Sequence, residues 1–275
     1  MDKLYRLAGA AGGSFICYGD EFGVRVNDLS LLHGIQHTLP PSTRMSSSHR
    51  VKAVYSFLSP PKNDNPHFRK FHLLYENAQL IERKIHGLDL LGTFENAVNL
   101  HVAQWARPYV FVHAGVVGWK GRAIVIPGAS RSGKSTLVSA FLRAGAVFLS
   151  DEYAVFDKRG KVYPFSRPIS LRATPELNVK VNPTDFGAIT ATAPFPVRMI
   201  IVAKYDLSSH WKPKSLTRGQ ALLSLLANAI SARHRPDANV RILSTVVDHS
   251  LSLRGVRGDA DETVDAIVQE FDKRA

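Results

Sequence analysis

Residues 122–136 read RAIVIPGASRSGKST, and this stretch decides the fold. Arg122–Pro127 is an apolar segment that predicts a strand, and Thr136–Arg143 has a helical pattern. Between them, Gly128–Ser135 matches G-x-x-x-x-G-K-[ST], a loop that holds phosphates when a strand precedes it and a helix follows it. The bare pattern arises by chance in roughly one chain of this length in a hundred, and the strand–loop–helix context makes chance a poor explanation. We therefore predict a site for nucleotide phosphates.

The residue types of this loop suit that ligand. Gly128 and Gly133 let the backbone curl so that successive N–H groups point at phosphate oxygens, and the following helix adds the partial positive charge of its N-terminus. We expect Lys134 to reach the β- and γ-phosphates and the Ser135 hydroxyl to complete a magnesium shell, so the predicted ligands are ATP or another nucleoside triphosphate, with Mg²⁺. The predicted nucleotide-binding residues are Gly128, Ser130, Arg131, Ser132, Gly133, Lys134, Ser135 and Thr136. A glycine-rich turn with a surface lysine is the alternative interpretation.

Two carboxylates are predicted to lie level with the phosphates. The helix that ends near Ala144 spans about ten residues, or roughly 15 Å, and Gly145 is suited to end it. The apolar strand Ala146–Ser150 then returns by roughly 16 Å, so Asp151 and Glu152 should arrive beside the loop. Such a pair fits a ligand for a metal ion or water together with a general base, and Ser135, Asp151 and Glu152 are the candidate metal ligands. A polar strand end is the alternative.

His113 is placed by a similar argument. Phe111–Val117 and Arg122–Ile126 have the pattern of two strands of a hairpin, and a two-residue turn at Trp119-Lys120 would set His113 opposite Ile126. The imidazole would then lie beside the start of the phosphate loop, which predicts a catalytic or substrate-orienting role. The alternative is a hydrogen-bonded histidine of the core.

Two arginines downstream, Arg167 and Arg172, flank a short predicted strand and are candidates for a clamp on phosphate charge in the transition state. Solvated arginines of a polar loop would look the same in sequence. The histidines show no spacing with Cys or acidic residues that is typical of zinc ligands, so we predict no zinc site.

The length and composition set the frame for these motifs. With 275 residues, 45% hydrophobic and 21% charged, the chain has a globular composition with room for two domains or for one with a large extension. A helix predicted over 88–106 ends before Pro108, and we place a domain boundary there. Residues 1–107 read as an α+β region without recognisable chemistry, a candidate for substrate or partner binding, and residues 108–275 contain the phosphate loop.

Cys17, the single cysteine, excludes an intrachain disulfide and favours a reducing compartment. No stretch is long and apolar enough to predict a membrane span, and the first residues do not read as a signal peptide, so we expect a cytoplasmic protein. Elsewhere the pattern predicts strands over 14–18, 22–26, 51–58, 71–75, 79–82 and 199–203, and helices over 217–230 and 259–272.

The formal net charge of +12 favours an anionic ligand. Between Glu95 and Asp151 there are six basic residues and no carboxylate, so half of this excess lies in about a fifth of the chain. That concentration favours a local anion such as a nucleotide. The segment His67–His72 interleaves basic and aromatic side chains as single-strand binders do, but a strand with alternating faces explains it as well, so nucleic acid stays a minor hypothesis.

Taken together, the motifs resemble the catalytic domain of HPr kinase/phosphorylase, and more closely the shorter HPr-kinase-related proteins of bacteria. The resemblance covers residues 112–157 and rests on VHAG at 112–115, the loop, and GAVFLSDE at 145–152. It implies an α/β fold in which a P-loop kinase domain with a mixed sheet, of the HPr kinase and phosphoenolpyruvate carboxykinase type, follows a smaller α+β region. It also implies transfer of a γ-phosphoryl group to a serine-type hydroxyl, with Asp151 as base, His113 hydrogen-bonding nearby, and Lys134 with Ser135 on phosphates and magnesium.

The chain also departs from that family. It has Asp-Glu where the family has paired aspartates, Arg131 where the family usually has glycine, and no Pro-x-Arg-Pro-Gly-Arg stretch, which is associated with the reverse reaction. The acceptor therefore stays open between a peptide or protein serine and a small alcohol, and a homo-oligomer stays open as a partner. A nucleotide-binding sensor that transfers no phosphoryl group is the hypothesis from another class.

Overall fold

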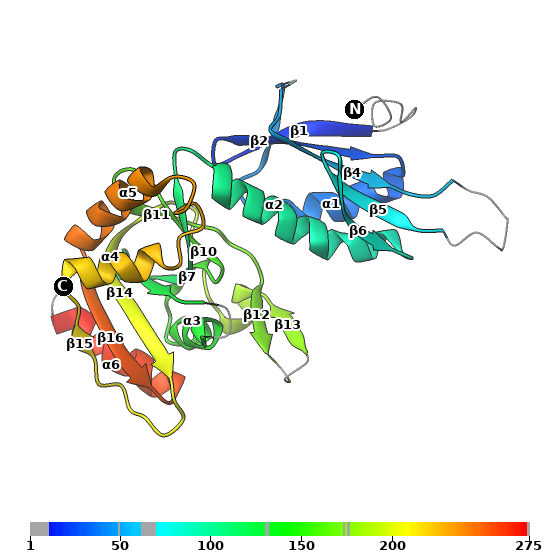
Figure 1. The fold of residues 1–275 in the computed structure, drawn as a ribbon. Helices are drawn as coiled ribbons and strands as arrows, with labels where there is room; N and C mark the ends of the chain where they lie inside the picture. The colour runs from blue at the N-terminus through cyan, green and yellow to red at the C-terminus, as the bar shows by residue number, and fades with distance from the viewer. Residues whose placement is uncertain are drawn as a thin grey trace. The chain divides into compact units, whose positions relative to one another are not determined.

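The computed structural model describes residues 11–48, 50–61, 70–129, 132–172, 174 and 177–273. It shows a mixed α/β protein that divides into two compact units, Met1–Arg107 and Pro108–Ala275 (Figure 1). Each unit has its own sheet and its own helices. Among the residues just given, no helix combines the length and the apolar character needed to cross a bilayer.

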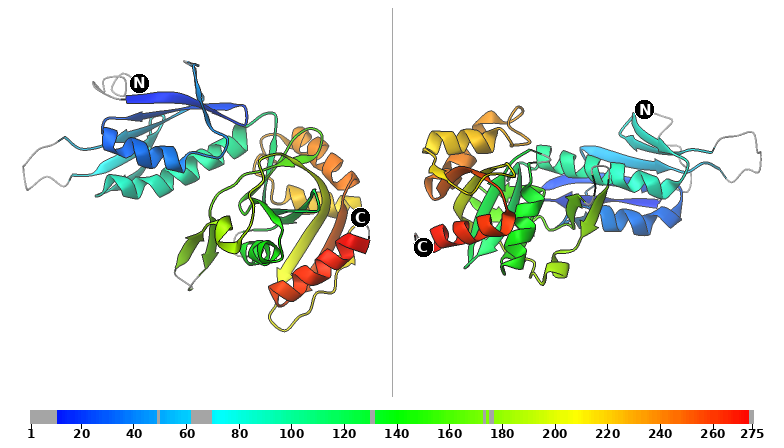
Figure 2. Two further views of the ribbon diagram at one scale, coloured as in Figure 1. Left: turned by 180° about the vertical axis from the view of Figure 1, so that it is seen from behind. Right: turned by 90° about the horizontal axis from the view of Figure 1, so that it is seen from below.

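The first unit is a sheet with strand order β3-β1-β2-β4-β5-β6, with α1 and α2 on one face (Figures 1 and 2). Its elements are β1 Ala11–Cys17, β2 Asp20–Val26, α1 Leu32–Thr38, β3 Arg44–Ser46, β4 Ala53–Leu58, β5 His72–Glu76, β6 Gln79–Lys84 and α2 Leu91–Trp105. The predicted strands differ from these at their ends, and residues 67–69 of the basic–aromatic segment lie outside the described residues. The first residues of the predicted helix 88–106 form a 3₁₀ turn, Gly87–Leu90, and α2 follows it and buries Phe94, Val98 and Val102 on one stripe.

A polar cluster lies inside this unit. The Asp20 carboxylate is fully buried and forms ion pairs with Lys52 and with His101, whose Nε2 lies 3.0 Å from Asp20 Oδ2. Burial opposes ionisation of Asp20, but hydrogen bonds from His101 and Lys52 outweigh it and hold the pKa of the carboxyl below its usual value. The cluster is part of the core of this unit.

The second unit contains a larger sheet with strand order β11-β10-β7-β8-β14-β16-β15, and β9 pairs with β7 beside this path. Its strands are β7 Val110–Trp119, β8 Arg122–Pro127, β9 Val147–Ser150, β10 Tyr153–Phe156, β11 Lys161–Tyr163, β14 Phe195–Tyr205, β15 Lys214–Ser215 and β16 Leu251–Arg257, with a separate hairpin of β12 Ile169–Arg172 and β13 Asn178–Val181. Its helices are α3 Lys134–Arg143, α4 Arg218–Leu226, α5 Pro236–Asp248 and α6 Ala260–Lys273. Helices α3 and α6 cover one face of the sheet, and α4 and α5 cover the other (Figures 1 and 2).

The strand directions bring several carboxyl ends to one edge. β14 runs parallel to both β8 and β16, so Pro127, Tyr205 and Arg257 end their strands on the same side of the sheet. β9 and β8 are both antiparallel to β7, so β9 also ends at this edge, with Ser150. Loops at the carboxyl ends of parallel strands are where α/β proteins place their ligand sites.

The β7–β8 hairpin differs from the prediction in its register. The turn residues are Lys120 and Gly121, with φ of 47° and 77°, and Trp119 pairs with Arg122. Positive φ at both positions is typical of a type I′ turn, which favours glycine at the second position and excludes the predicted turn at Trp119-Lys120. Gly115, rather than His113, therefore lies opposite Ile126. His113 instead accepts a hydrogen bond at its carbonyl from Gly128 N, at 3.3 Å.

Two helices after the large strands also differ from the prediction. The capping box of Thr217 and Gln220 is present, but α4 ends at Leu226 rather than at residue 230. Helix α5 was not predicted, although Pro236 stands at its first position and Ile242, Leu243, Val246 and Val247 are buried on one face. Together α4 and α5 supply one half of the core of this unit.

Candidate active site

A cavity of about 960 Å³ lies at the carboxyl edge of the second unit. The predicted site residues that line it are His113, Gly133, Lys134, Ser135, Thr136, Asp151, Glu152, Arg167 and Arg172. Gly128 and Ser132 are not among the lining residues, and Ser130 and Arg131 lie outside the described residues. The sheet topology thus brings the predicted loop, histidine, acidic pair and arginines to one cavity.

The predicted phosphate loop leads directly into α3. Gly133 has a φ of 84°, a left-handed conformation that favours glycine, and α3 begins at the next residue. The Lys134 side chain is only 7% exposed, and its Nζ donates to Ala129 O at 2.9 Å. Burial lowers the pKa of Lys134, and the Asp151 charge partly opposes that shift. A buried ammonium held by a loop carbonyl is a group that an anion in the cavity would stabilise.

The first residue of the acidic pair lies against the start of this helix. Ser135 Oγ donates to Asp151 Oδ2 at 2.7 Å, while Asp151 Oδ1 is buried and accepts no hydrogen bond from the described residues. Burial raises the pKa of Asp151 to about 6, although the Ser135 hydrogen bond and the Lys134 charge lower it. An acceptor oxygen that is buried and unpartnered costs free energy unless a ligand satisfies it. Asp151 is therefore placed to accept a proton or to bind a cation.

His113 lies beside the acidic pair from the neighbouring strand. Its Nδ1 is 2.8 Å from Glu152 O, and because a carbonyl oxygen only accepts, we assign the ring proton to Nδ1 and the lone pair to Nε2. Burial, with a contribution from the Lys134 charge, lowers the pKa of His113 to about 4. The imidazole is therefore neutral at neutral pH, with Nε2 as a hydrogen-bond acceptor.

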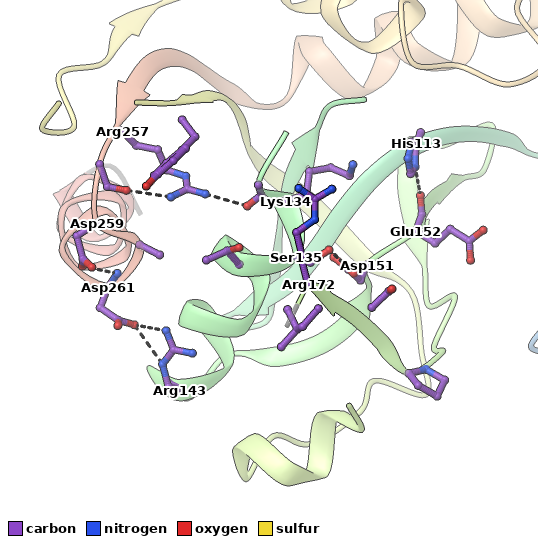
Figure 3. Close-up of a pocket in the computed structure, with 18 of the residues that line it drawn as sticks. His113, Lys134, Ser135, Arg143, Asp151, Glu152, Arg172, Arg257, Asp259 and Asp261 are labelled. Atoms are coloured by element: carbon purple, nitrogen blue, oxygen red, sulfur yellow. Dashed lines mark hydrogen bonds and ion pairs between the residues drawn. The ribbon is translucent and has the colours of Figure 1, made fainter. Parts of the chain in front are cut away.

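Of the three predicted metal ligands, Ser135 and Asp151 are in contact, whereas the Glu152 side chain points away from both in Figure 3. Within the part of the chain that the structure describes, no cluster of three or more His, Cys, Asp or Glu side chains would hold a metal ion by itself. A hydroxyl and a carboxylate in contact with each other fit Mg²⁺, which takes few protein ligands and completes its shell with phosphates and water.

Arg257 is a site residue that the sequence analysis did not find. It ends β16, is 2% exposed, and lines the cavity. Its Nη2 donates to Gly133 O at 2.9 Å, its Nη1 donates to Gly258 O at 3.0 Å, and its guanidinium lies 5.2 Å from the centre of the Tyr205 ring. It takes part in none of the ion pairs found among the described residues. A buried cation without a carboxylate in contact, beside the phosphate loop, favours an anionic ligand there.

The cavity has two ends on either side of the loop. Figure 3 shows His113 and Glu152 on one side of Lys134 and Ser135, and Arg257, Asp259 and Asp261 on the other. Arg167 and Arg172 line the same cavity, and Arg172 is exposed at the end of β12.

The opposite pKa shifts of His113 and Asp151 predict a specific pH dependence of stability. In the folded protein the Asp151 carboxyl has a pKa of about 6, against 3.8 in the unfolded chain. Its contribution to the unfolding free energy therefore falls as pH rises from about 4 to 6. The His113 imidazole has a pKa of about 4 in the folded protein, against 6.5 in the unfolded chain, so its contribution to the unfolding free energy rises over the same pH range. Relative to the unchanged protein, the unfolding free energy of His113→Gln should fall by about 2 kcal/mol from pH 4 to 6, and that of Asp151→Asn should rise by about as much. Urea titrations at the two pH values measure this, and parallel profiles of all three proteins would contradict it.

Comparison with known proteins gives only a distant likeness to solved structures. No family model matches the chain, and no curated protein matches it. Among solved structures, the Hpr(Ser) kinase/phosphatase from Coxiella burnetii matches with a TM-score of 0.29 and 11% sequence identity, over 60% of this chain and 93% of that one. Function is therefore inferred from the residues of the cavity.

Proposed function

We propose that the protein is a P-loop kinase of the HPr kinase type that transfers the γ-phosphoryl group of ATP, or of another nucleoside triphosphate, to a hydroxyl group. A serine of a peptide or protein is the proposed acceptor. The observation that carries the proposal is the contact between Ser135 and Asp151 at the start of α3, next to Lys134. Through this contact, the loop proposed to bind phosphates lies next to Asp151, a carboxylate that can accept a proton.

The phosphate side of the proposal rests on the loop. The N-terminus of α3 and the Lys134 ammonium both favour negative charge at this point of the cavity. The Lys134–Ala129 hydrogen bond shows how close the ammonium lies to the loop backbone. The terminal phosphates of the donor would replace that carbonyl as the partner of the ammonium.

The acceptor side rests on Asp151. In the proposed reaction the acceptor oxygen forms a bond to the γ-phosphorus, the bond from that phosphorus to the β–γ bridging oxygen breaks, and the nucleoside diphosphate leaves. The proton of the acceptor hydroxyl goes to Asp151, whose Oδ1 has no other partner among the described residues. A raised pKa suits this role, because a base works best when its pKa lies close to the working pH.

His113 and the two arginines would position the acceptor and balance charge. The neutral His113 ring offers Nε2 as a second hydrogen-bond acceptor in the cavity that Asp151 also lines. Arg167 and Arg172 would face the charge that develops on the transferred group. Mg²⁺, when bound, would neutralise phosphate charge, and Ser135 and Asp151 Oδ2 are the side-chain oxygens that would hold it.

The kinase can be tested before its acceptor is identified, because water is a poor but universal hydroxyl acceptor. The full chain with γ-labelled ATP should release phosphate slowly in Mg²⁺ and stop when EDTA is added. Added arrays of serine, threonine and tyrosine peptides should then take up label on serine, whereas glycerol and free serine test the small-alcohol alternative. Tight nucleotide binding with neither hydrolysis nor transfer would refute the proposal and favour the nucleotide sensor.

A further inference from the structure

We propose that the nucleoside of the donor binds at the Tyr205 end of the cavity, against the Tyr205 ring and Leu207, with Arg257 on the inner phosphates. This inference rests on the proposed function and adds to it a site for the nucleoside. It distinguishes a nucleotide donor from inorganic tripolyphosphate, which the phosphate loop alone would also accept.

The direction of the donor follows from the position of Asp151. The γ-phosphate has to lie nearest to this carboxylate, because the acceptor hydroxyl attacks in line from its side. The rest of the donor then extends from Lys134 away from Asp151. Figure 3 shows that Arg257 and Asp259 lie in that direction, across the loop from His113.

Arg257 is the first group that the donor meets beyond the loop. Its guanidinium is fixed by the Gly133 and Gly258 carbonyls and is almost completely buried. These carbonyl oxygens carry no full charge, and Asp259 acts on the guanidinium only through space, without an ion pair among the described residues. Phosphate oxygens next to Gly133 would supply a negative partner in contact, and only the inner phosphates lie on this side of Lys134.

Beyond Arg257 the charge of the cavity changes sign. Asp259 accepts the backbone N–H groups of Asp261 and Glu262, and these hydrogen bonds hold the pKa of the Asp259 carboxyl below its usual value. Asp261 also lines the cavity and forms an ion pair with Arg143 at 2.7 Å. Because Arg143 balances the charge of Asp261 and lines the same cavity, the Asp259 carboxylate is the group that disfavours further phosphates at this end and favours an uncharged group with hydroxyls, as in a ribose.

The same end offers an apolar surface for a base. Tyr205 is 51% exposed and Leu207 is 83% exposed, and both line the cavity. The segment that carries them is held in place, because Asp206 N donates to Arg257 O at 2.9 Å and a Cβ on Gly258 would lie 2.1 Å from Ser209 O. An exposed aromatic ring on a fixed segment is a stacking surface for a base, and most bases fit it equally well.

The experiment compares two ligands by titration calorimetry of the full chain in Mg²⁺: a non-hydrolysable ATP analogue and inorganic tripolyphosphate. Tyr205→Ala should weaken the analogue about tenfold and tripolyphosphate much less, because the nucleoside loses its stacking partner whereas Arg257 loses the ring but keeps its hydrogen bonds to Gly133 and Gly258. Tyr205→Phe keeps the ring and should keep the affinity of the unchanged protein. Leu207→Ala, at an exposed position that the fold does not depend on, should weaken only the analogue.

Equal loss of both ligands in Tyr205→Ala, or no loss of the analogue in either alanine variant, would overturn the inference. Equal affinity of the unchanged protein for the analogue and tripolyphosphate would do the same while leaving the phosphate site intact. Failure of the unchanged protein to bind either ligand would refute the proposed function itself.

Discussion

Replacing Asp151 by asparagine is expected to lower kcat for phosphoryl transfer by about 10³-fold, because the variant cannot take the proton of the acceptor hydroxyl. The amide keeps the size of the side chain and an oxygen that accepts the Ser135 hydroxyl, so the site should stay assembled. Nucleotide affinity should remain within about threefold, since the loop and Lys134 bind the phosphates and the lost negative charge reduces repulsion of them. Single-turnover transfer and calorimetry measure the two quantities separately.

The pH profile gives this prediction a second readout. In the unchanged protein kcat/KM should fall as pH drops below about 6, where Asp151 of the free protein becomes protonated, and the variant should lack this limb. Asp272→Asn is the matched control, because Asp272 is an exposed carboxylate of α6 that pairs with Lys120 outside the cavity. A kcat for Asp151→Asn within tenfold of the unchanged protein would exclude Asp151 as the base.

The sequence predicts the part of the site that short-range geometry determines. The loop, α3 and β9 follow one another without a long connection, so the lengths of one helix and one strand suffice to bring Asp151 back to Ser135. Gly145, which was expected to end the helix, has a φ of 94°, the left-handed conformation that such a position favours. Where structure is consecutive along the chain, residue spacing carries most of the information.

The end of the cavity that contains Arg257 and Tyr205 could not be predicted from residue spacing. Arg257 is 124 residues from Gly133, and the two meet only because β14 inserts between β8 and β16. Nothing in the local pattern separates this arginine, or Tyr205, from a solvated side chain. Strand order in a sheet depends on packing between distant segments, which periodicity does not report.

Two further features, one local and one dependent on distant segments, were also not predictable. The β7–β8 turn contains Lys120 at a positive φ, which is uncommon for residues other than glycine. Gly121 was therefore the one residue in the sequence that indicated where the turn lies, and it is a weak indication of the strand register. In the first unit, Asp20 is buried while its neighbour Glu21 is partly exposed. The ion pairs of Asp20 with Lys52 and His101 come from separate segments, and the sequence does not show them.

Replacing Lys134 by methionine is expected to weaken nucleotide binding by about 10²-fold and to abolish measurable transfer, because charge-assisted hydrogen bonds to phosphate are lost. The stability of the ligand-free protein should not fall. Lys134 is 7% exposed, and burial lowers the pKa of its ammonium, so this charge is costly in the empty site and an apolar side chain of similar length removes that cost. The variant would thus lose function without losing its fold.

Thermal unfolding with and without Mg-ATP tests both halves of this expectation. At a nucleotide concentration of about a hundred times Kd, binding stabilises the unchanged protein by about 2.7 kcal/mol, whereas a hundredfold weaker site gains only about 0.4 kcal/mol. Lys120→Met is the control, because Lys120 is an exposed lysine in a turn of the same unit and should leave both values unchanged. A lower Tm for ligand-free Lys134→Met would show that the ammonium stabilises the empty loop. A full nucleotide-induced shift in that variant would show that the phosphates bind elsewhere.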